Sequence, residues 1–229
     1  MVRAILDGSK TATRRVVKPY RGHPLVNLAV AEPSHSYSGL HNDAASWGYE
    51  FVDDGAPASL AAWPELCPYG QPGGRLWVRE TWTPGYDHEA DHENGPRVSL
   101  IYRADNVEVT VAAPTYELAD EWERNYSEDG DTPPPWKPSI HMPRWASRIT
   151  LEVVGVRVER LQDIDRAGAL AEGIVDMSTP SHTAFGTPGA SLAQHPIRAF
   201  QLLWESINGA GSWDANPWVW VVEFKRVQP

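Results

Sequence analysis

The stretch RITLEVVGVRVERL, residues 148–161, decides the fold that we predict for this chain. Apolar residues first occupy alternate positions, at Ile149, Leu151 and Val153, as in a strand with one buried face. The alternation then shifts by one position, because Val154 follows Val153 directly and a glycine comes next. Such a shift beside a glycine is typical of a bulge or a bend. We therefore expect one long, bent strand here.

Three further segments have the pattern of strands. Residues 75–82 alternate polar and apolar side chains after a Pro-Gly-Gly turn signal, and residues 97–104 repeat this alternation. Residues 218–227 are strongly apolar. We expect these three strands and the long bent strand to share one barrel-like sheet.

Helical patterns occupy other parts of the chain. A short amphipathic stretch ends at Gly8, residues 161–173 place apolar residues on one face and end at Gly173, and residues 192–207 do the same. Strands and helices that do not alternate regularly favour an α+β fold. We expect a small, closed or nearly closed β-barrel with flanking helices and long loop insertions.

Length and composition are compatible with one large domain. The chain has 229 residues, of which 41% are hydrophobic, so it can bury a substantial core. We interpret residues 1–229 as a single domain with insertions at about 20–65, 84–96, 113–135 and 176–191, where Gly, Pro and polar residues gather. Residues 120–135 are acidic, end in three prolines and are interpreted as an exposed loop.

The single cysteine, Cys67, excludes an intramolecular disulfide and a zinc site built from several cysteines. The sequence has no run of about 18 apolar residues and no signal-peptide core at its start. We therefore expect a cytoplasmic protein without a membrane partner.

Charge is distributed unevenly along the chain. The net charge is −10, which disfavours broad binding to a long nucleic acid through many phosphates. Residues 3–21 nevertheless hold six basic side chains and only one acidic side chain, Asp7. An acidic protein with a local basic pocket suits a small or local anionic ligand.

The sequence HEADH, residues 88–92, matches the zinc-protease motif H-E-x-x-H. That motif requires a long buried helix, but proline and glycine flank this segment on both sides and no bulky apolar residue is available to bury it. We interpret it as an exposed acidic loop, and we expect neither a metal nor another cofactor.

The segment KTATR, residues 10–14, is the strongest candidate for chemistry. It could be a solvent-facing edge strand with polar cross-strand pairs. Alternatively, Lys10 and Thr13 point into one cavity, where partial burial lowers the pKa of the lysine. A lysine of this kind can accept the proton of a hydroxyl group or of water, which makes Thr13 a candidate nucleophile.

Several ordered blocks resemble the ASCH domain of the PUA-like superfamily. They are DGSKTATRR near the start, PGGRLWVRETW, KPSIHMPRWASRITLEVVGVRVERL, AGALAEGI and the closing WVVEFKRV. Together they cover about half of the residues and are similar to the large ASCH-type proteins of bacteriophages and prophages. The resemblance implies a PUA-like β-barrel whose cleft, between barrel and helices, binds RNA.

The resemblance also implies site residues. Small bacterial relatives that hydrolyse N(4)-acetylcytidine use a lysine, a threonine three residues later and a glutamate from the helix, which correspond here to Lys10, Thr13 and Glu172. Arg14 replaces an apolar residue of that group and leaves the substrate open. Glu172 lies near a helix C-terminus, where the helix dipole disfavours a carboxylate, and this favours a functional role for it.

A second group consists of aromatic and basic side chains that could bind a substrate: Trp82, His141, Arg144 and Trp145. Aromatic rings stack on bases, and arginines contact phosphates or base edges. The alternative is that Trp82 or Trp145 belongs to the core.

These patterns predict a cleft, lined by Lys10, Thr13, Arg14, Arg144 and Glu172, that binds RNA or a modified nucleoside. The chain is then either an amidohydrolase acting on an acylated nucleoside or a non-catalytic reader of RNA or modified bases. A ribonuclease, or a phage accessory protein whose acidic insertions meet a protein partner, remains a further alternative.

Overall fold

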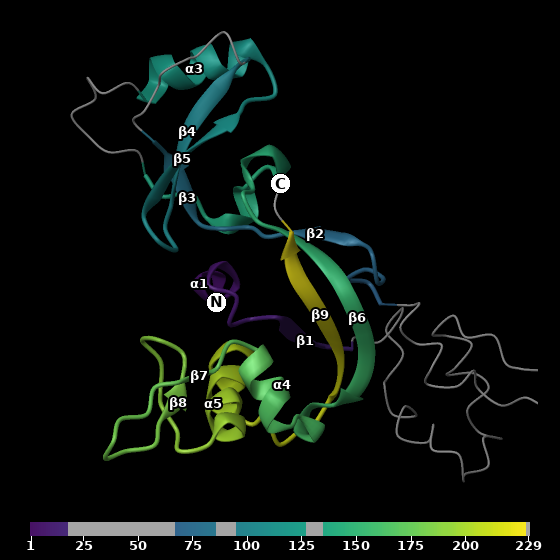
Figure 1. The fold of residues 1–229 in the computed structure, drawn as a ribbon. Coiled ribbons are helices and arrows are strands. Elements are labelled where there is room, and N and C mark those ends of the chain that lie inside the picture. The colour runs from purple at the N-terminus through teal and green to yellow at the C-terminus, as the bar shows by residue number, and fades with distance from the viewer. Residues whose placement is uncertain (18–66, 86–94, 127–134, 228–229) are drawn as a thin grey trace, which may run out of the picture. The chain divides into compact units, whose positions relative to one another are not determined.

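The computed structural model describes residues 1–17, 67–85, 95–126 and 135–227 (Figure 1). The chain separates into two compact units. The first unit consists of Met1–Leu6, Arg75–Leu151 and Arg226–Pro229, and the second of Asp7–Gly74 and Glu152–Lys225. The single-domain organisation stays a prediction.

A curled, antiparallel half-barrel sheet confirms the α+β class (Figure 1). Its strand order is β1 (Ala12–Val16), β9 (Trp218–Val227), β6 (Thr150–Arg160), β2 (Arg75–Trp77). The long strand β6 curves as its sequence predicts. An added Cβ at Gly155 would lie 2.9 Å from Glu223 Oε2 of the neighbouring strand, so the glycine permits this close approach.

Two helices of the second unit pack together beside this sheet. Helix α4 (Arg166–Ala171) begins at Asp165, whose carboxylate accepts a 2.6 Å hydrogen bond from the Gly168 N–H, and it ends before Gly173, where φ is +92°. Helix α5 (Pro196–Asn208) begins with a proline, which suits the first helical turn. Both helices were predicted from sequence, at residues 161–173 and 192–207, so each begins four or five residues later than expected.

The core of the second unit joins these helices to strand β9 and to a small hairpin, β7 (Val175–Asp176) and β8 (Phe185–Gly186). Its buried residues are Leu161, Ile164, Ala169, Ile174, Phe185, Ala199, Phe200, Trp204, Trp213, Val219 and Val221. In β9, residues 219–222 are buried without interruption, which explains why this strand is apolar rather than alternating.

The first unit contains a second sheet, formed by β3 (Trp82–Pro84), β4 (Arg97–Tyr102) and β5 (Val107–Ala112). Helix α3 (Tyr116–Tyr126) packs on β4 through Ala119 and Trp122, and α1 (Val2–Leu6) belongs to the same unit. Short 3-10 helices occupy Ser139–His141 (η5), Arg144–Ala146 (η6) and, in the second unit, Leu161–Asp163 (η7).

The structure corrects two expectations. The strand predicted at residues 97–104 lies in this second sheet and not beside β6 and β9, because β3, β4 and β5 pair with their neighbours in sequence. The strand predicted at residues 75–82 is correspondingly divided between β2 and β3. Part of the acidic segment 120–135 forms helix α3 instead of a loop, since Ala119 and Trp122 bury one face of it. The HEADH segment lies outside the described residues.

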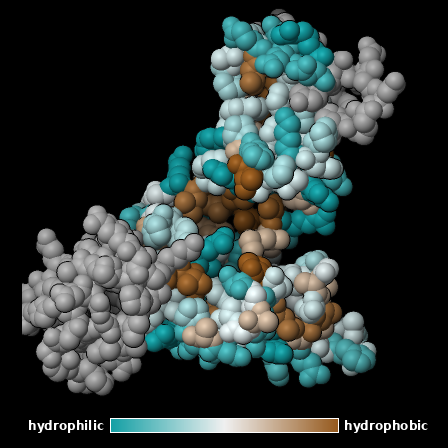
Figure 2. All heavy atoms as spheres, turned by 180° about the vertical axis from the view of Figure 1, so that it is seen from behind, coloured by the Kyte–Doolittle hydropathy of each residue, from teal (hydrophilic) through white to brown (hydrophobic). Residues whose placement is uncertain are grey.

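Ten large hydrophobic side chains are exposed among the described residues. Figure 2 shows one face, on which hydrophobic residues, in brown, lie among hydrophilic ones. Among the residues that the structure describes, no helix combines the length and the apolar character needed to cross a membrane.

Candidate ligand-binding site

Lys10 and Glu172 form a buried ion pair in the second unit. Lys10 precedes β1 and Glu172 caps the C-terminus of α4, and the two residues also form an isolated β-bridge. Lys10 Nζ lies 2.6 Å from Glu172 Oε2, and the side chains are only 3% and 6% exposed. Sequence reasoning placed these two residues in one site, and the structure brings them together.

The Lys10 ammonium group has an acceptor for each of its three N–H donors. Besides the Glu172 carboxylate, Nζ donates to the main-chain oxygens of Ala12 at 2.8 Å and Glu172 at 2.9 Å. Burial lowers the pKa of Lys10, and the attraction of Glu172 opposes this effect. The three acceptors therefore favour the charged lysine, although burial disfavours it.

Arg14 extends the ion pair. Its Nη1 lies 3.4 Å from Glu172 Oε1, while Nε and Nη2 donate to Glu159 Oε1 at 2.9 and 2.7 Å. The Arg14 side chain is 1% exposed. Because a Cβ at position 168 would lie 2.8 Å from Arg14 Nη2, Gly168 gives the guanidinium the space that it occupies.

The charges continue along β6 to β9. Arg157 Nε donates to Glu159 Oε2 at 3.0 Å, and Arg157 Nη1 contacts Glu223 Oε1. We name the whole series the ion-pair chain: Lys10, Glu172, Arg14, Glu159, Arg157 and Glu223. It alternates three cations with three carboxylates, so its formal charge is zero. One end of it is buried, with Lys10, Glu172 and Arg14 at most 6% exposed, and the other end is not, with Arg157 and Glu223 46% and 43% exposed.

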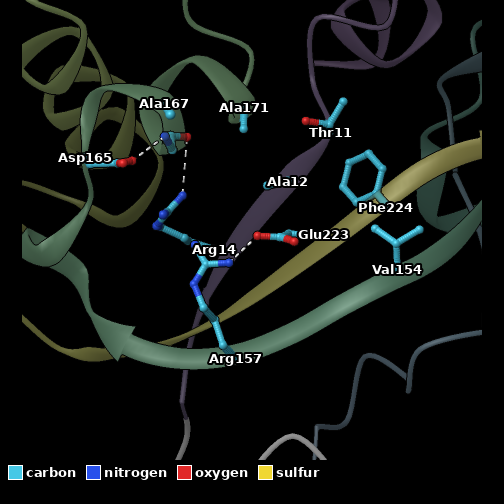
Figure 3. A pocket seen from close by; sticks show the side chains of 11 residues that line it. Thr11, Ala12, Arg14, Val154, Arg157, Asp165, Ala167, Ala171, Glu223 and Phe224 are labelled. Carbon is cyan, nitrogen blue, oxygen red and sulfur yellow. Dashed lines mark hydrogen bonds and ion pairs between the residues drawn. The ribbon is translucent and has the colours of Figure 1, made fainter.

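A pocket of about 380 Å³ opens beside the ion-pair chain. Residues of α4 and its N-cap, including Asp165 and Ala167, line one side, and the strand residues Val154, Glu223 and Phe224 line another (Figure 3). Arg14 lies between them, with Nη1 3.5 Å from the Gly168 carbonyl oxygen. The pocket therefore combines an aromatic ring, aliphatic side chains and several hydrogen-bonding groups.

The structure separates the two threonines of the KTAT segment. Thr11 lines the pocket (Figure 3), whereas Thr13 does not. Thr13 pairs with Val222 and lies between Ala12 and Arg14 on β1. Because alternate strand residues point to opposite faces, its side chain lies on the face opposite to that of Arg14. The catalytic role of Thr13 stays a prediction.

The second predicted group belongs to the first unit, whereas the pocket belongs to the second. Trp82 is 3% exposed and stacks on Trp122 with 5.7 Å between ring centroids. Trp145 meets Trp122 edge-on at 6.0 Å, while His141 and Arg144 are exposed. The two tryptophans thus contribute to packing, and a role for this group in binding substrate stays a prediction.

Sequence reasoning missed Arg157, Glu159 and Glu223, although a signal for the first two was present. In the predicted strand, Arg157 and Glu159 alternate with valines and so share its polar face. No local sequence pattern identifies Glu223, Asp165 or Phe224 as site residues. Strand register and helix packing place them there. Comparison with protein-family models, curated proteins and solved structures finds no match to this chain.

Proposed function

We propose that the chain binds a nucleobase, free as a nucleoside or within RNA, in the pocket of the second unit. The observation that carries this proposal is the pairing of the Phe224 ring with hydrogen-bonding groups at Thr11, Arg14 and Asp165 in one pocket of about 380 Å³. Small-molecule sites commonly have such volumes, with a mostly apolar lining and a few orienting polar groups. An aromatic ring beside donors and acceptors suits a planar base.

The charge of the site supports a neutral ligand. Each cation of the ion-pair chain already faces at least one carboxylate, and the formal charges cancel. A phosphate would have to compete with Glu159 and Glu172 for Arg14, whereas a neutral base can form hydrogen bonds without breaking an ion pair. We therefore expect a nucleoside to bind at least as tightly as its nucleotide.

The PUA-like assignment is part of the same proposal. A curled half-barrel with α4 and α5 beside it, together with the ordered sequence blocks that resemble the ASCH domain, supports it. The proposed ligand lies where that resemblance implies a cleft, between the barrel and a helix.

Ligand titration tests the binding function. Calorimetry with cytidine, N(4)-acetylcytidine, uridine and adenosine should show saturable binding of at least one nucleoside. Ala167→Trp should abolish it, because Ala167 is exposed and lines the pocket, so a large ring there fills the space without disturbing the core. Ser206→Trp is the matched control, at an exposed position of α5 outside the pocket lining. Equal binding by both variants, or none by the wild type, would refute the proposal.

Amide hydrolysis on an acylated base is a second candidate. The 2.6 Å pair of Lys10 and Glu172, with the pKa of the lysine lowered by burial, favours it, because this pair could transfer protons in a general acid–base mechanism. In that case Thr11, which lines the pocket, is a better placed hydroxyl than Thr13.

Acetate release from N(4)-acetylcytidine tests hydrolysis. Lys10→Ala, Glu172→Ala and Thr11→Val should each lose on the order of a hundredfold in rate or more, while Thr13→Val should retain activity. Thermal melting would show that each variant is folded. A wild-type protein that binds the nucleoside and never hydrolyses it would exclude the enzyme and retain the binding function.

A further inference from the structure

Three exposed arginines of the first unit lie over tryptophan rings. The Cζ atoms of Arg79 and Arg144 lie 4.8 and 5.8 Å from the ring centroid of Trp77. Arg103 Cζ lies 5.8 Å from the ring centroid of Trp136, which is 40% exposed. We call these five residues the arginine–tryptophan surface. The stacking holds each guanidinium in place at the protein surface.

None of these three arginines is paired with a carboxylate in the part of the chain that the structure describes. Arg148 of the same unit differs, because Glu80 and Asp105 neutralise it through hydrogen bonds of 2.9 to 3.0 Å. The sequence around Trp136 and Arg144 also lacks acidic residues, since residues 132–151 contain no Asp or Glu, although the protein has 30. Among the residues that the structure describes, this surface therefore carries positive charge that no carboxylate neutralises.

Main-chain hydrogen bonds connect Arg103, and the residue after Trp136, to residues close to Arg79. The Arg103 N–H donates to the Thr81 carbonyl oxygen at 2.9 Å. Lys137, the neighbour of Trp136, exchanges two main-chain hydrogen bonds with Trp82, at 2.7 and 3.2 Å. Both contacts lie within three residues of Arg79, a span of at most about 11 Å of extended chain. Arg79 and Arg144 also share the Trp77 ring, so the parts of this surface lie close together in the first unit.

We propose that this surface binds the backbone of a single-stranded nucleic acid. An arginine that stacks on an aromatic ring keeps its edge N–H groups available for two parallel hydrogen bonds to a phosphate. The exposed part of Trp136 provides a face on which a base can stack. Three cations match a few phosphates of a short strand, whereas the net charge of −10 opposes a long duplex.

This site does not depend on the pocket of the second unit. Its three arginines have no carboxylate partner among the described residues and lie beside an exposed indole, whereas the cations of the pocket are already neutralised. The two proposals therefore predict different ligands and respond to different substitutions.

Fluorescence anisotropy of a labelled short oligouridine, measured over a series of salt concentrations, tests the site. Three phosphate contacts on a single strand predict a slope of log affinity against log salt of about −2. The exposed arginines allow mild changes: Arg79→Gln, Arg103→Gln and Arg144→Gln should each reduce the slope by about 0.7. Trp136→Leu should weaken binding by about tenfold and leave the slope unchanged.

The controls separate this site from the pocket and from general anion binding. Arg198→Gln removes an exposed arginine from α5 of the second unit and should change neither affinity nor slope. Ala167→Trp should abolish nucleoside binding and leave oligouridine binding intact. Oligouridine binding that survives the triple arginine variant would overturn the proposal, as would equal competition by polyglutamate, which would indicate an acidic peptide instead.

Discussion

The buried end of the ion-pair chain predicts a large effect of a nearly isosteric substitution. Glu172→Gln removes the carboxylate that faces Lys10 Nζ at 2.6 Å and Arg14 Nη1 at 3.4 Å, and it leaves both cations buried. Removing one partner of a buried ion pair costs about 3–5 kcal/mol. We expect the free energy of unfolding of the second unit to fall by this amount.

Lys10→Met tests the same contact from its other side. It removes the cation and also leaves the main-chain oxygens of Ala12 and Glu172 without the Nζ donor, at a cost of about 1–3 kcal/mol each. The double variant removes both charges together. Its loss should therefore be smaller than the sum of the single losses, by about 1.5–3 kcal/mol for a charged hydrogen bond.

The exposed end of the ion-pair chain is the matched control. Arg157 and Glu223 are 46% and 43% exposed, so Arg157→Met or Glu223→Gln should cost about 1 kcal/mol or less. Denaturant titration followed by circular dichroism gives the losses, and amide exchange of the buried residues of β9 reports on the second unit. Equal losses at both ends of the chain, or strictly additive losses for Lys10 and Glu172, would refute the reasoning.

Three further predictions concern individual contacts. Gly168→Ala should weaken nucleoside binding, because the new Cβ would lie 2.8 Å from Arg14 Nη2 and displace it; unchanged calorimetric affinity would contradict this. Asp165→Ala should cost about 1 kcal/mol of unfolding free energy through loss of the 2.6 Å N-cap bond, whereas Asp165→Asn should largely retain it in thermal melting. Burial raises the pKa of Tyr102, which donates to the Ala146 carbonyl oxygen at 2.7 Å, above its ordinary value of 10.0. The unfolded chain then loses this proton first as pH rises, so stability of the first unit should fall above about pH 10, and Tyr102→Phe should remove that part of the alkaline loss.

Local patterns in the sequence determined the elements. Alternation in residues 148–160, a continuous apolar run in residues 218–222 and glycine at position 173 report on burial and backbone conformation within a few residues, and the structure has β6, β9 and the end of α4 at these places. The same locality explains the errors. Periodicity shows that residues 97–102 form a strand, but not that β3 and β5, its neighbours in sequence, pair with it in a separate sheet.

The site depended on contacts between distant parts of the chain. Lys10 and Glu172 are 162 residues apart, and no local pattern connects them; only the proposed similarity to the ASCH domain placed them in one site before the structure did. The pairing of β1 with β9 puts Thr13 on the strand face opposite to that of Arg14, whereas Thr11 precedes β1 and lines the pocket, and alternation alone does not separate two threonines two positions apart. The sequence by itself therefore determined which segments are strands and helices and which residues can ionise. Only the tertiary structure decided that three cations meet three carboxylates in the second unit, while three arginines of the first unit meet none among the described residues, because strand register and burial set these distances.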